Sequence, residues 1–224
     1  MAGRGGGGGV QLGRFSRKAQ VSSLLQQVAE AYNQDMGITS DFLPDENFNV
    51  QRSATVGVGD VAADPEISAS TVLLTTMYVR LLAPPSRGKQ TDAVQRGDEL
   101  FAGIGCVACH VPSMRTGPHE IPTLSQQTAQ LYSDLLLHDM GPRLADDRPD
   151  GDATGTEWRT APLWGTRLVP EFLGGREFYL HDGSATSLHD AIIAHGGEAQ
   201  SSRDAYIAFD AAAQDDLVAF LKSL

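Results

Sequence analysis

The sequence is poor in three features that mark common classes of protein: cysteine, basic side chains and long hydrophobic runs. With only two cysteines among 224 residues, the chain cannot form a framework of several disulfides. No uncharged apolar stretch approaches the roughly 18 residues that a membrane-spanning helix needs. The longest are pieces such as TVLLTTMYV. We therefore expect neither a disulfide-stabilised miniprotein nor a membrane-inserted one.

Basic residues are outnumbered, with 17 Lys and Arg against 28 Asp and Glu, for a formal net charge of -11. An acidic chain without a basic cluster repels phosphate backbones and anionic lipid. Nucleic acid and membrane surfaces are thus not expected as partners. An export signal is also not visible at the start, where MAGRGGGGGVQLGR places five glycines in the position of a signal's apolar segment.

The pattern of hydrophobic and turn-forming residues predicts a mainly helical chain with long loops. Residues 1–13 are rich in glycine and are expected to be a disordered tail. Residues 84–92, with two adjacent prolines, are the best candidate for a linker. Asp64 is expected to cap one helix, and Ser187 with Asp190 another. The helices are expected at residues 18–36, 64–82, within 91–105, at 125–137, 187–195 and 213–224, with an irregular loop at 38–60.

Both cysteines fall in one motif, Cys106-Val107-Ala108-Cys109-His110. A disulfide across so short a loop would constrain little of the unfolded chain. A thioredoxin-type redox pair would require an α/β pattern, which is absent here. A zinc site would need further ligands at short spacing, and the nearest candidate, His119, is nine residues on without a second pair.

The remaining interpretation of this motif is covalent attachment of one c-type haem. Two thiols one helical turn apart match the two vinyl groups of the porphyrin, and the imidazole of His110 follows at the position that binds the iron. The bound macrocycle would also supply a large apolar surface to the core. Because bacteria attach haem covalently outside the cytoplasm, this interpretation implies a periplasmic protein.

The residues alone do not decide which side chain is the sixth ligand of the iron. Met140 would raise the reduction potential, as in electron-transfer cytochromes. His195 lies on the apolar face of an expected helix, where an imidazole needs a partner. The full set of candidates is Met114, His119, His138, Met140, His181 and His195, of which the first two follow the motif too closely to cross the porphyrin plane.

Three segments carry a resemblance to a known family: GDELFAGIGCVACHVPSMRTG, YSDLLLHDMGPRLADDRPDGDATGTEWRTAPLWG and FYLHDGSATSLHDAIIAHGGEA. They resemble the second haem domain of the bacterial di-haem oxidoreductases, sometimes labelled thiol-oxidoreductase-like. That family is similar to the di-haem cytochrome c peroxidases and to the di-haem enzymes that mature methylamine dehydrogenase. The resemblance implies a mainly α, cytochrome c-like haem domain with long loops at residues 93–224, preceded by a partial helical domain at 14–83.

The resemblance also bears on the iron. In the peroxidase relatives, the HDG turn leads into a helix that carries the distal ligand late in its course, and this position falls on His195. The resemblance therefore implies a bis-histidine iron, His110 and His195, with Met140 as the alternative. Relatives carry two haem motifs where this chain has one, so the first would be expected upstream of Met1. Where relatives tend to place a tryptophan, this chain has Arg17.

Further residues are candidates for binding. Trp158, Arg159 and Trp164 are expected to line the haem, with the guanidinium pairing a propionate; ordinary packing is the alternative. The peroxidase relatives bind calcium between their domains, and an oxygen-rich loop here could do so, although a solvated acidic loop is the alternative. That loop carries Asp147, Asp150, Asp152 and Glu157.

Taken together, these features predict one-electron transfer through a low-spin haem, with electrons exchanged with a redox partner protein or a small donor or acceptor. The first alternative is an enzyme that reduces peroxide at its haem. The second is a truncated product without function.

Overall fold

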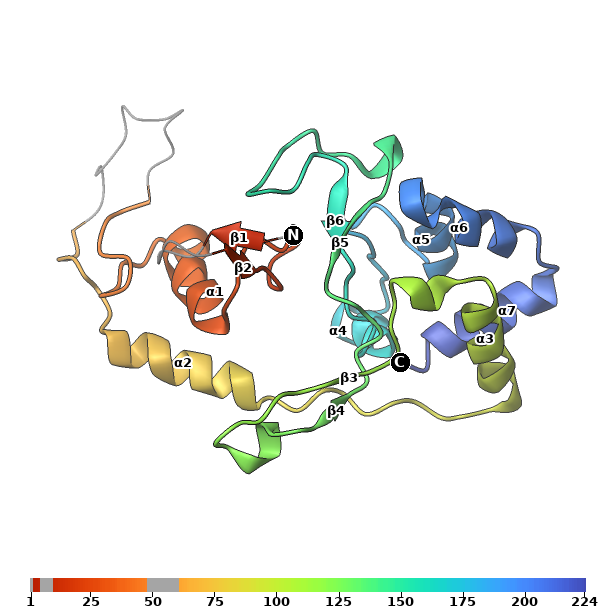
Figure 1. Ribbon diagram of the computed structural model, residues 1–224, viewed down its shortest axis with the longest axis horizontal. Coiled ribbons are helices and arrows are strands. Elements are labelled where there is room, and N and C mark those ends of the chain that lie inside the picture. Colours follow the sequence, from red (N-terminus) through yellow and green to blue (C-terminus); the bar gives the residue numbers. More distant parts are fainter. Residues whose placement is uncertain (1, 5–9, 48–60) are drawn as a thin grey trace. The chain divides into compact units, whose positions relative to one another are not determined.

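A computed structural model describes residues 2–4, 10–47 and 61–224 (Figure 1). The chain forms two compact units, a small one of residues 21–82 and a larger one that joins residues 1–20 to residues 83–224. Of the expected loop at 38–60, residues 48–60 lie outside the described residues. The domain boundaries inferred from the sequence, 14–83, 84–92 and 93–224, stay a prediction.

The glycine-rich start of the chain, expected to be disordered, is described only in two short strands. These strands, β1 and β2, pair antiparallel with Ala2 opposite Leu12. Their bounds are Ala2–Arg4 for β1 and Val10–Leu12 for β2.

The small unit consists of two helices that pack through Val28, Ala29 and Val72. The first begins later than expected, because Ser23 caps it by accepting a hydrogen bond from the backbone N–H of Gln26. It then continues as one π-helical turn. The bounds are Leu24–Glu30 for α1, Ala31–Asp35 for the π-turn and Ala69–Leu81 for α2.

The expected start of the second helix at Asp64 is wrong. The helix begins after Ser68 instead. The Asp64 carboxylate accepts a hydrogen bond from the Thr39 hydroxyl, and Asp64 lies four residues before the cap position. The carboxylate of Asp41 accepts a hydrogen bond from the backbone N–H of Ala69, the first residue of the helix, at 2.6 Å.

The core of the larger unit is the contact between two helices that lie side by side, α3 (Asp92–Gly103) and α7 (Ala211–Leu221) (Figure 1). Gly97 allows this close approach, because a Cβ there would lie 2.1 Å from the backbone oxygen of Asp216. The rings of Phe101 and Phe220 then meet across the contact, with centroids 5.2 Å apart.

The other elements of the larger unit are short. Strand β3 pairs with β4, and β5 with β6, each as an antiparallel pair. The helices are α4 (Val169–Phe172), α5 (Leu188–Ala194) and α6 (Gln200–Ile207), and the strands are β3 (Met114–Arg115), β4 (Thr128–Ala129), β5 (Leu137–Asp139) and β6 (Glu157–Arg159). The 3-10 turns are η3 (Cys106–Ala108), η4 (Pro122–Leu124), η5 (Pro142–Leu144), η6 (Thr166–Leu168) and η7 (Gly197–Ala199).

The predicted mainly α, cytochrome c-like fold is wrong. Of the residues that the structure describes, 41% are helical and 10% are in strands, and long irregular segments lie between the cysteine motif and α5. The helix expected at 125–137 does not form, since Tyr132 and Leu135 have φ angles of 52° and 60°. These left-handed residues interrupt any helix. Tyr132 is nevertheless buried, so the apolar pattern of this segment reflects burial and not helical periodicity.

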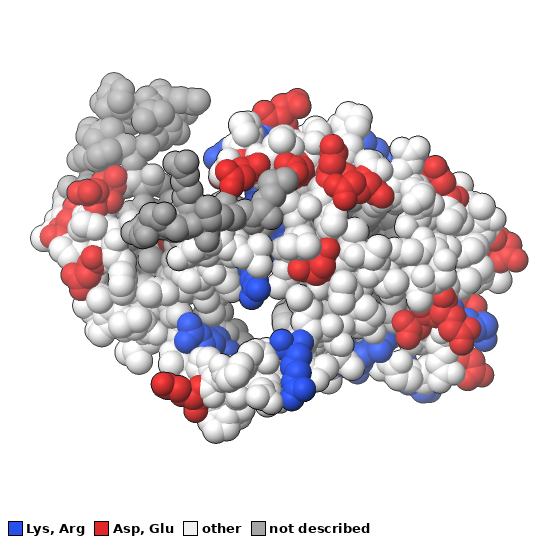
Figure 2. All heavy atoms as spheres, viewed as in Figure 1, with Lys and Arg blue, Asp and Glu red and all other residues white. Residues whose placement is uncertain are grey.

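None of the helices in the described part of the chain is long and apolar enough to cross a membrane. On the face drawn in Figure 2, Lys and Arg occur in small separate groups and do not form one continuous basic patch. This distribution agrees with the net negative charge of the sequence.

Candidate functional site

The cysteine motif lies directly after α3, in a tight turn. Gly105 starts the turn with a φ of +87°, a conformation that favours glycine. Within the turn, the backbone N–H groups of Cys109 and His110 both donate to the carbonyl of Cys106, at 3.3 and 2.9 Å. Both thiols are free and partly exposed. The two cysteines therefore do not form a disulfide with each other.

The thiols are in an unfavourable setting for thiol chemistry. Burial raises the pKa of Cys106 to about 11. Burial also raises the pKa of Cys109, and the nearby carboxylates of Asp134 and Glu198 raise it further. Because the thiolate is the nucleophile, both groups are weak nucleophiles at neutral pH. This disfavours a redox-active cysteine pair.

His110 lies beside this turn with its ring fixed by one hydrogen bond. Its Nδ1 lies 3.0 Å from the carbonyl oxygen of Tyr132. A carbonyl only accepts, so Nδ1 carries the proton and Nε2 keeps its lone pair. Burial lowers the pKa of His110 to about 4. The ring is therefore neutral at pH 7, in the tautomer that metal-ligating histidines adopt.

His195 is held in the same way. It is the residue that ends α5, whose start is capped as expected by Ser187, which accepts the N–H of Asp190 at 3.0 Å. The Nδ1 of His195 lies 2.7 Å from the carbonyl oxygen of Ala191, one turn back in the helix. Burial lowers its pKa. His195 thus also has a neutral ring with a lone pair on Nε2.

The rings of His110 and His195 lie close to each other. The centroids of His110 and His195 are 6.5 Å apart, and their planes are inclined at 51°. Two metal–nitrogen bonds of ~2.0 Å, with ~1.2 Å from each Nε2 to its ring centre, add to roughly 6.4 Å. The separation therefore fits one iron ion between the two imidazoles. No hydrogen bond from the described residues occupies either Nε2.

The other expected ligands have different surroundings. His138 makes two hydrogen bonds to carboxylates, and His181 stacks on Trp158 with ring centroids 3.6 Å apart. His119 accepts the backbone N–H of Ile121 in an exposed loop. Met140 follows β5, where its carbonyl packs close to Gly196. Of the candidate ligands whose surroundings the structure describes, His195 is the one whose ring lies beside that of His110.

Trp158 and Arg159, expected to line the haem, lie in β6. The Trp158 indole donates to the carbonyl of Leu144 at 2.8 Å, and the ammonium group of Lys18 lies 4.1 Å above the ring centre. The indole is therefore enclosed by protein groups, as expected for ordinary packing. Trp164, by contrast, is 39% exposed.

The guanidinium of Arg159 is bonded to backbone carbonyls. Its Nε and Nη1 donate to the carbonyls of Ser16 and Thr160, at 2.7 and 3.3 Å. Burial lowers its pKa. Both bonds are to neutral acceptors, so the pairing of this guanidinium with a propionate stays a prediction.

The loop considered for calcium does not gather its carboxylates. Among the described residues, some side chains bring three possible metal-ligand atoms within 4.8 Å of one another. None of these groups contains an acidic residue of this loop. Asp150 instead accepts from the side chain of Gln20 at 3.1 Å, and Glu157 from the backbone N–H of Thr154 at 2.8 Å. The calcium hypothesis gains no support here. The four residues are Asp147, Asp150, Asp152 and Glu157.

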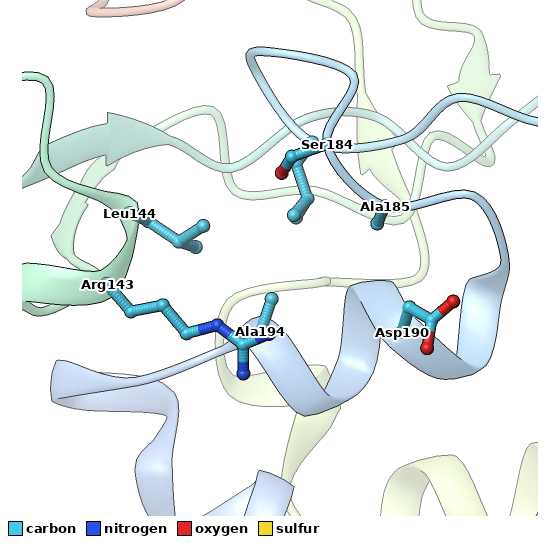
Figure 3. A pocket seen from close by; sticks show the side chains of 7 residues that line it. Arg143, Leu144, Ser184, Ala185, Asp190 and Ala194 are labelled. Atoms are coloured by element: carbon cyan, nitrogen blue, oxygen red, sulfur yellow. The ribbon is translucent and has the colours of Figure 1, made fainter.

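A small cavity lies beside α5, next to the helix end that carries His195. Figure 3 shows Arg143 extending along it toward Ala194, with Leu144 and Ala185 on its walls. Its volume is about 80 Å³, room for a few water molecules. The guanidinium of Arg143 donates to the carbonyl of Ile193 at 3.2 Å and so supports the last turn of the helix.

The sequence did not reveal the groups that orient the two imidazoles. These are the carbonyls of Tyr132 and Ala191. Backbone carbonyls leave no residue-type signal. The partner of His195 is four residues earlier in a helix and could have been inferred from helical spacing. The partner of His110 is 22 residues away in an irregular loop, and no sequence pattern places it there.

Comparison with known proteins gives one match. No curated protein and no solved structure matches the chain. One family model matches residues 1–224, under the description "Di-haem oxidoreductase, putative peroxidase". This match covers the whole chain. It implies a haem cofactor and a role in oxidation and reduction. The chain belongs to the di-haem oxidoreductase family.

Proposed function

We propose that the chain carries one covalent c-type haem on Cys106 and Cys109 and transfers single electrons through it. His110 and His195 are the residues that would bind its iron. The separation of their rings, 6.5 Å between centroids, carries this proposal, because it suits an iron ion bound to both. The chain has no third cysteine, so a second haem attached by two thioethers would have to belong to another polypeptide segment.

Haem iron supplies a one-electron couple between its ferric and ferrous forms. The chain's own contribution is to hold both imidazoles neutral and oriented. Each Nδ1–H is engaged by a carbonyl, which fixes the tautomer and makes Nε2 the donor atom. With both imidazoles bound to the iron, no position would remain for a peroxide molecule. This favours electron transfer over peroxide reduction.

The proposal has implications for location and partners. Covalent haem attachment in bacteria implies the periplasm. As the second haem domain of a di-haem oxidoreductase, this site would exchange electrons with another haem, with a redox protein or with a small donor or acceptor. Peroxidase activity is the second candidate, and the description of the family favours it.

Spectroscopy on the full chain, made together with a haem maturation system, tests the proposal. Mass spectrometry should show one covalent haem, and the ferric protein should be low-spin and unchanged by hydrogen peroxide. His195→Ala should turn the spectrum high-spin, whereas Met140→Ala should leave it low-spin. A peptide mass without haem refutes the attachment. A high-spin native protein that reacts with peroxide favours the peroxidase.

A further inference from the structure

His138, in β5, lies between two carboxylates. Its Nε2 is 2.8 Å from a carboxylate oxygen of Asp134, and its Nδ1 is 2.9 Å from one of Glu198. Carboxylates accept hydrogen bonds, so both ring nitrogens carry protons and the ring is an imidazolium ion. The side chains of His138 and Asp134 are 17% and 12% exposed, and that of Glu198 is 55% exposed.

The pKa shifts of the three groups agree with this charge state. Burial by itself would lower the pKa of His138, but the hydrogen bonds and charges of Glu198 and Asp134 outweigh it and raise the pKa. The pKa of Glu198 is lowered, chiefly by its bond to His138. Burial acts to raise the pKa of Asp134, yet hydrogen bonds from Leu136 and His138 lower it overall. The three charges stabilise one another.

The first carboxylate belongs to the segment that holds His110. The backbone N–H of Asp134 donates to the carbonyl of Cys109 at 2.8 Å, one residue before the ligand. Two residues earlier, the carbonyl of Tyr132 fixes the His110 ring. The segment from Tyr132 to Asp134 therefore contacts the attachment motif at two points.

The second carboxylate belongs to the turn that follows His195. Glu198 lies in η7, and its other oxygen accepts the backbone N–H of Asp139 at 2.9 Å. Gly197 packs directly on the same strand end, because a Cβ there would lie 2.1 Å from the carbonyl oxygen of Asp139. Strand β5 thus contacts the segments of both proposed ligands.

We propose that His138 is a positioning residue, whose imidazolium between Asp134 and Glu198 fixes the separation of the His110 and His195 segments and keeps the iron six-coordinate. This inference rests on the proposed function, since it needs iron between the two rings. It assigns a role to a histidine that does not itself bind the metal. Without this central cation, two carboxylates near the attachment site repel each other and the segments separate.

His138→Gln in the full haem-loaded chain tests this role. A neutral amide has one donor group and one acceptor and cannot serve as a cationic donor to both carboxylates. We expect a mixture of low-spin and high-spin ferric haem and the binding of added imidazole at about tenfold lower concentration than in the native protein. His119→Gln is the matched control. Among the described residues, the hydrogen bonds of His119 are to its own exposed loop, so the spectrum of this variant should be native.

A second variant covers the case in which His138→Gln does not mature. Glu198→Gln changes the more exposed of the two carboxylates and keeps the ion pair of His138 with Asp134. This variant should also bind added imidazole more tightly than the native protein. If either matured variant has a native low-spin spectrum and native imidazole binding, the positioning role is refuted. A native chain that lacks covalent haem or low-spin iron refutes the proposed function instead. The two failures are thus distinct.

Discussion

Gly197→Ala is the sharpest test of how the turn after His195 is built. Gly197 has a φ of +53°, and an added Cβ would lie 2.1 Å from the carbonyl oxygen of Asp139 and 2.8 Å from the backbone nitrogen of Gly141. Both contacts are with backbone atoms, which cannot rotate away as a side chain can. The turn would have to move off the end of β5, and His195, two residues earlier, would move with it.

The size of the effect follows from two separate costs. A left-handed conformation costs alanine about 1 kcal/mol relative to glycine, and overpacking against a fixed neighbour costs about 1–3 kcal/mol. We expect Gly197→Ala to lower the free energy of unfolding by about 2–4 kcal/mol in total. Gly174→Ala is the matched control. It has a φ of +62° with no atom within 4 Å of the added Cβ, so it should show only the first cost.

Urea unfolding of the two haem-loaded variants, followed by far-UV circular dichroism, measures the difference. Gly197→Ala should also show partial high-spin character in the ferric spectrum, because His195 is displaced, whereas Gly174→Ala should not. Equal losses of stability in the two variants would refute the close packing of this turn on β5. A large loss with a native spectrum would show that the turn does not position His195.

Three further predictions concern the larger unit. Gly97→Ala should lower the free energy of unfolding by about 3 kcal/mol or more, because its Cβ would lie 2.1 Å from the backbone oxygen of Asp216; a native urea midpoint would contradict the tight contact of α3 with α7. Lys18→Met should lower it by about 2–3 kcal/mol, since the side chain of Lys18 is 5% exposed and its bond to Asp146 is lost. Tryptophan fluorescence should report the change, and an unchanged midpoint and emission would contradict this. The pKa of His138 is raised, so its contribution to stability is complete below the ordinary histidine pKa of ~6.5 and is lost as pH rises through the raised pKa. The pKa values of Asp134 and Glu198 are lowered, so the contribution of these carboxylates is lost as pH falls below ~4. Urea midpoints measured across pH should therefore decline on the alkaline side in the native protein and decline less in His138→Gln; equal declines would contradict the ion network.

The features that sequence reasoning predicted well are local ones. The cap at Ser187 forms because Asp190 is three residues further on in the same turn: the Ser187 hydroxyl accepts the backbone N–H of Asp190 and donates to its carboxylate. The final helix was expected from its apolar stripe, and α7 spans most of that segment. The family was recognised from motifs whose spacing reflects chemistry, above all the pair of thiols followed by His110.

The fold class was wrong because hydrophobic spacing records burial and not the path of the backbone. Residues 125–137 are apolar enough to suggest a helical face. In the structure, Leu131 and Tyr132 are buried by a loop whose turns use left-handed residues. The partners of that loop are distant: Leu163 donates its backbone N–H to the carbonyl of Leu131, and the Ser133 hydroxyl donates to the carbonyl of Thr160. Tertiary contacts of this range have no local signature.

His138 illustrates the same limit within the site. From the sequence it is one of several histidines that could bind iron, and its neighbour Met140 is equally suitable. The distinction depends on Glu198, which is 60 positions away and becomes a partner of His138 only when η7 packs on β5. Two carboxylates occupy both ring nitrogens of His138, whereas His110 and His195 each use one nitrogen on a carbonyl and keep the other for a metal. The hydrogen bonds of each ring, more than its place in the sequence, therefore decide which histidines can serve as ligands and which can position them.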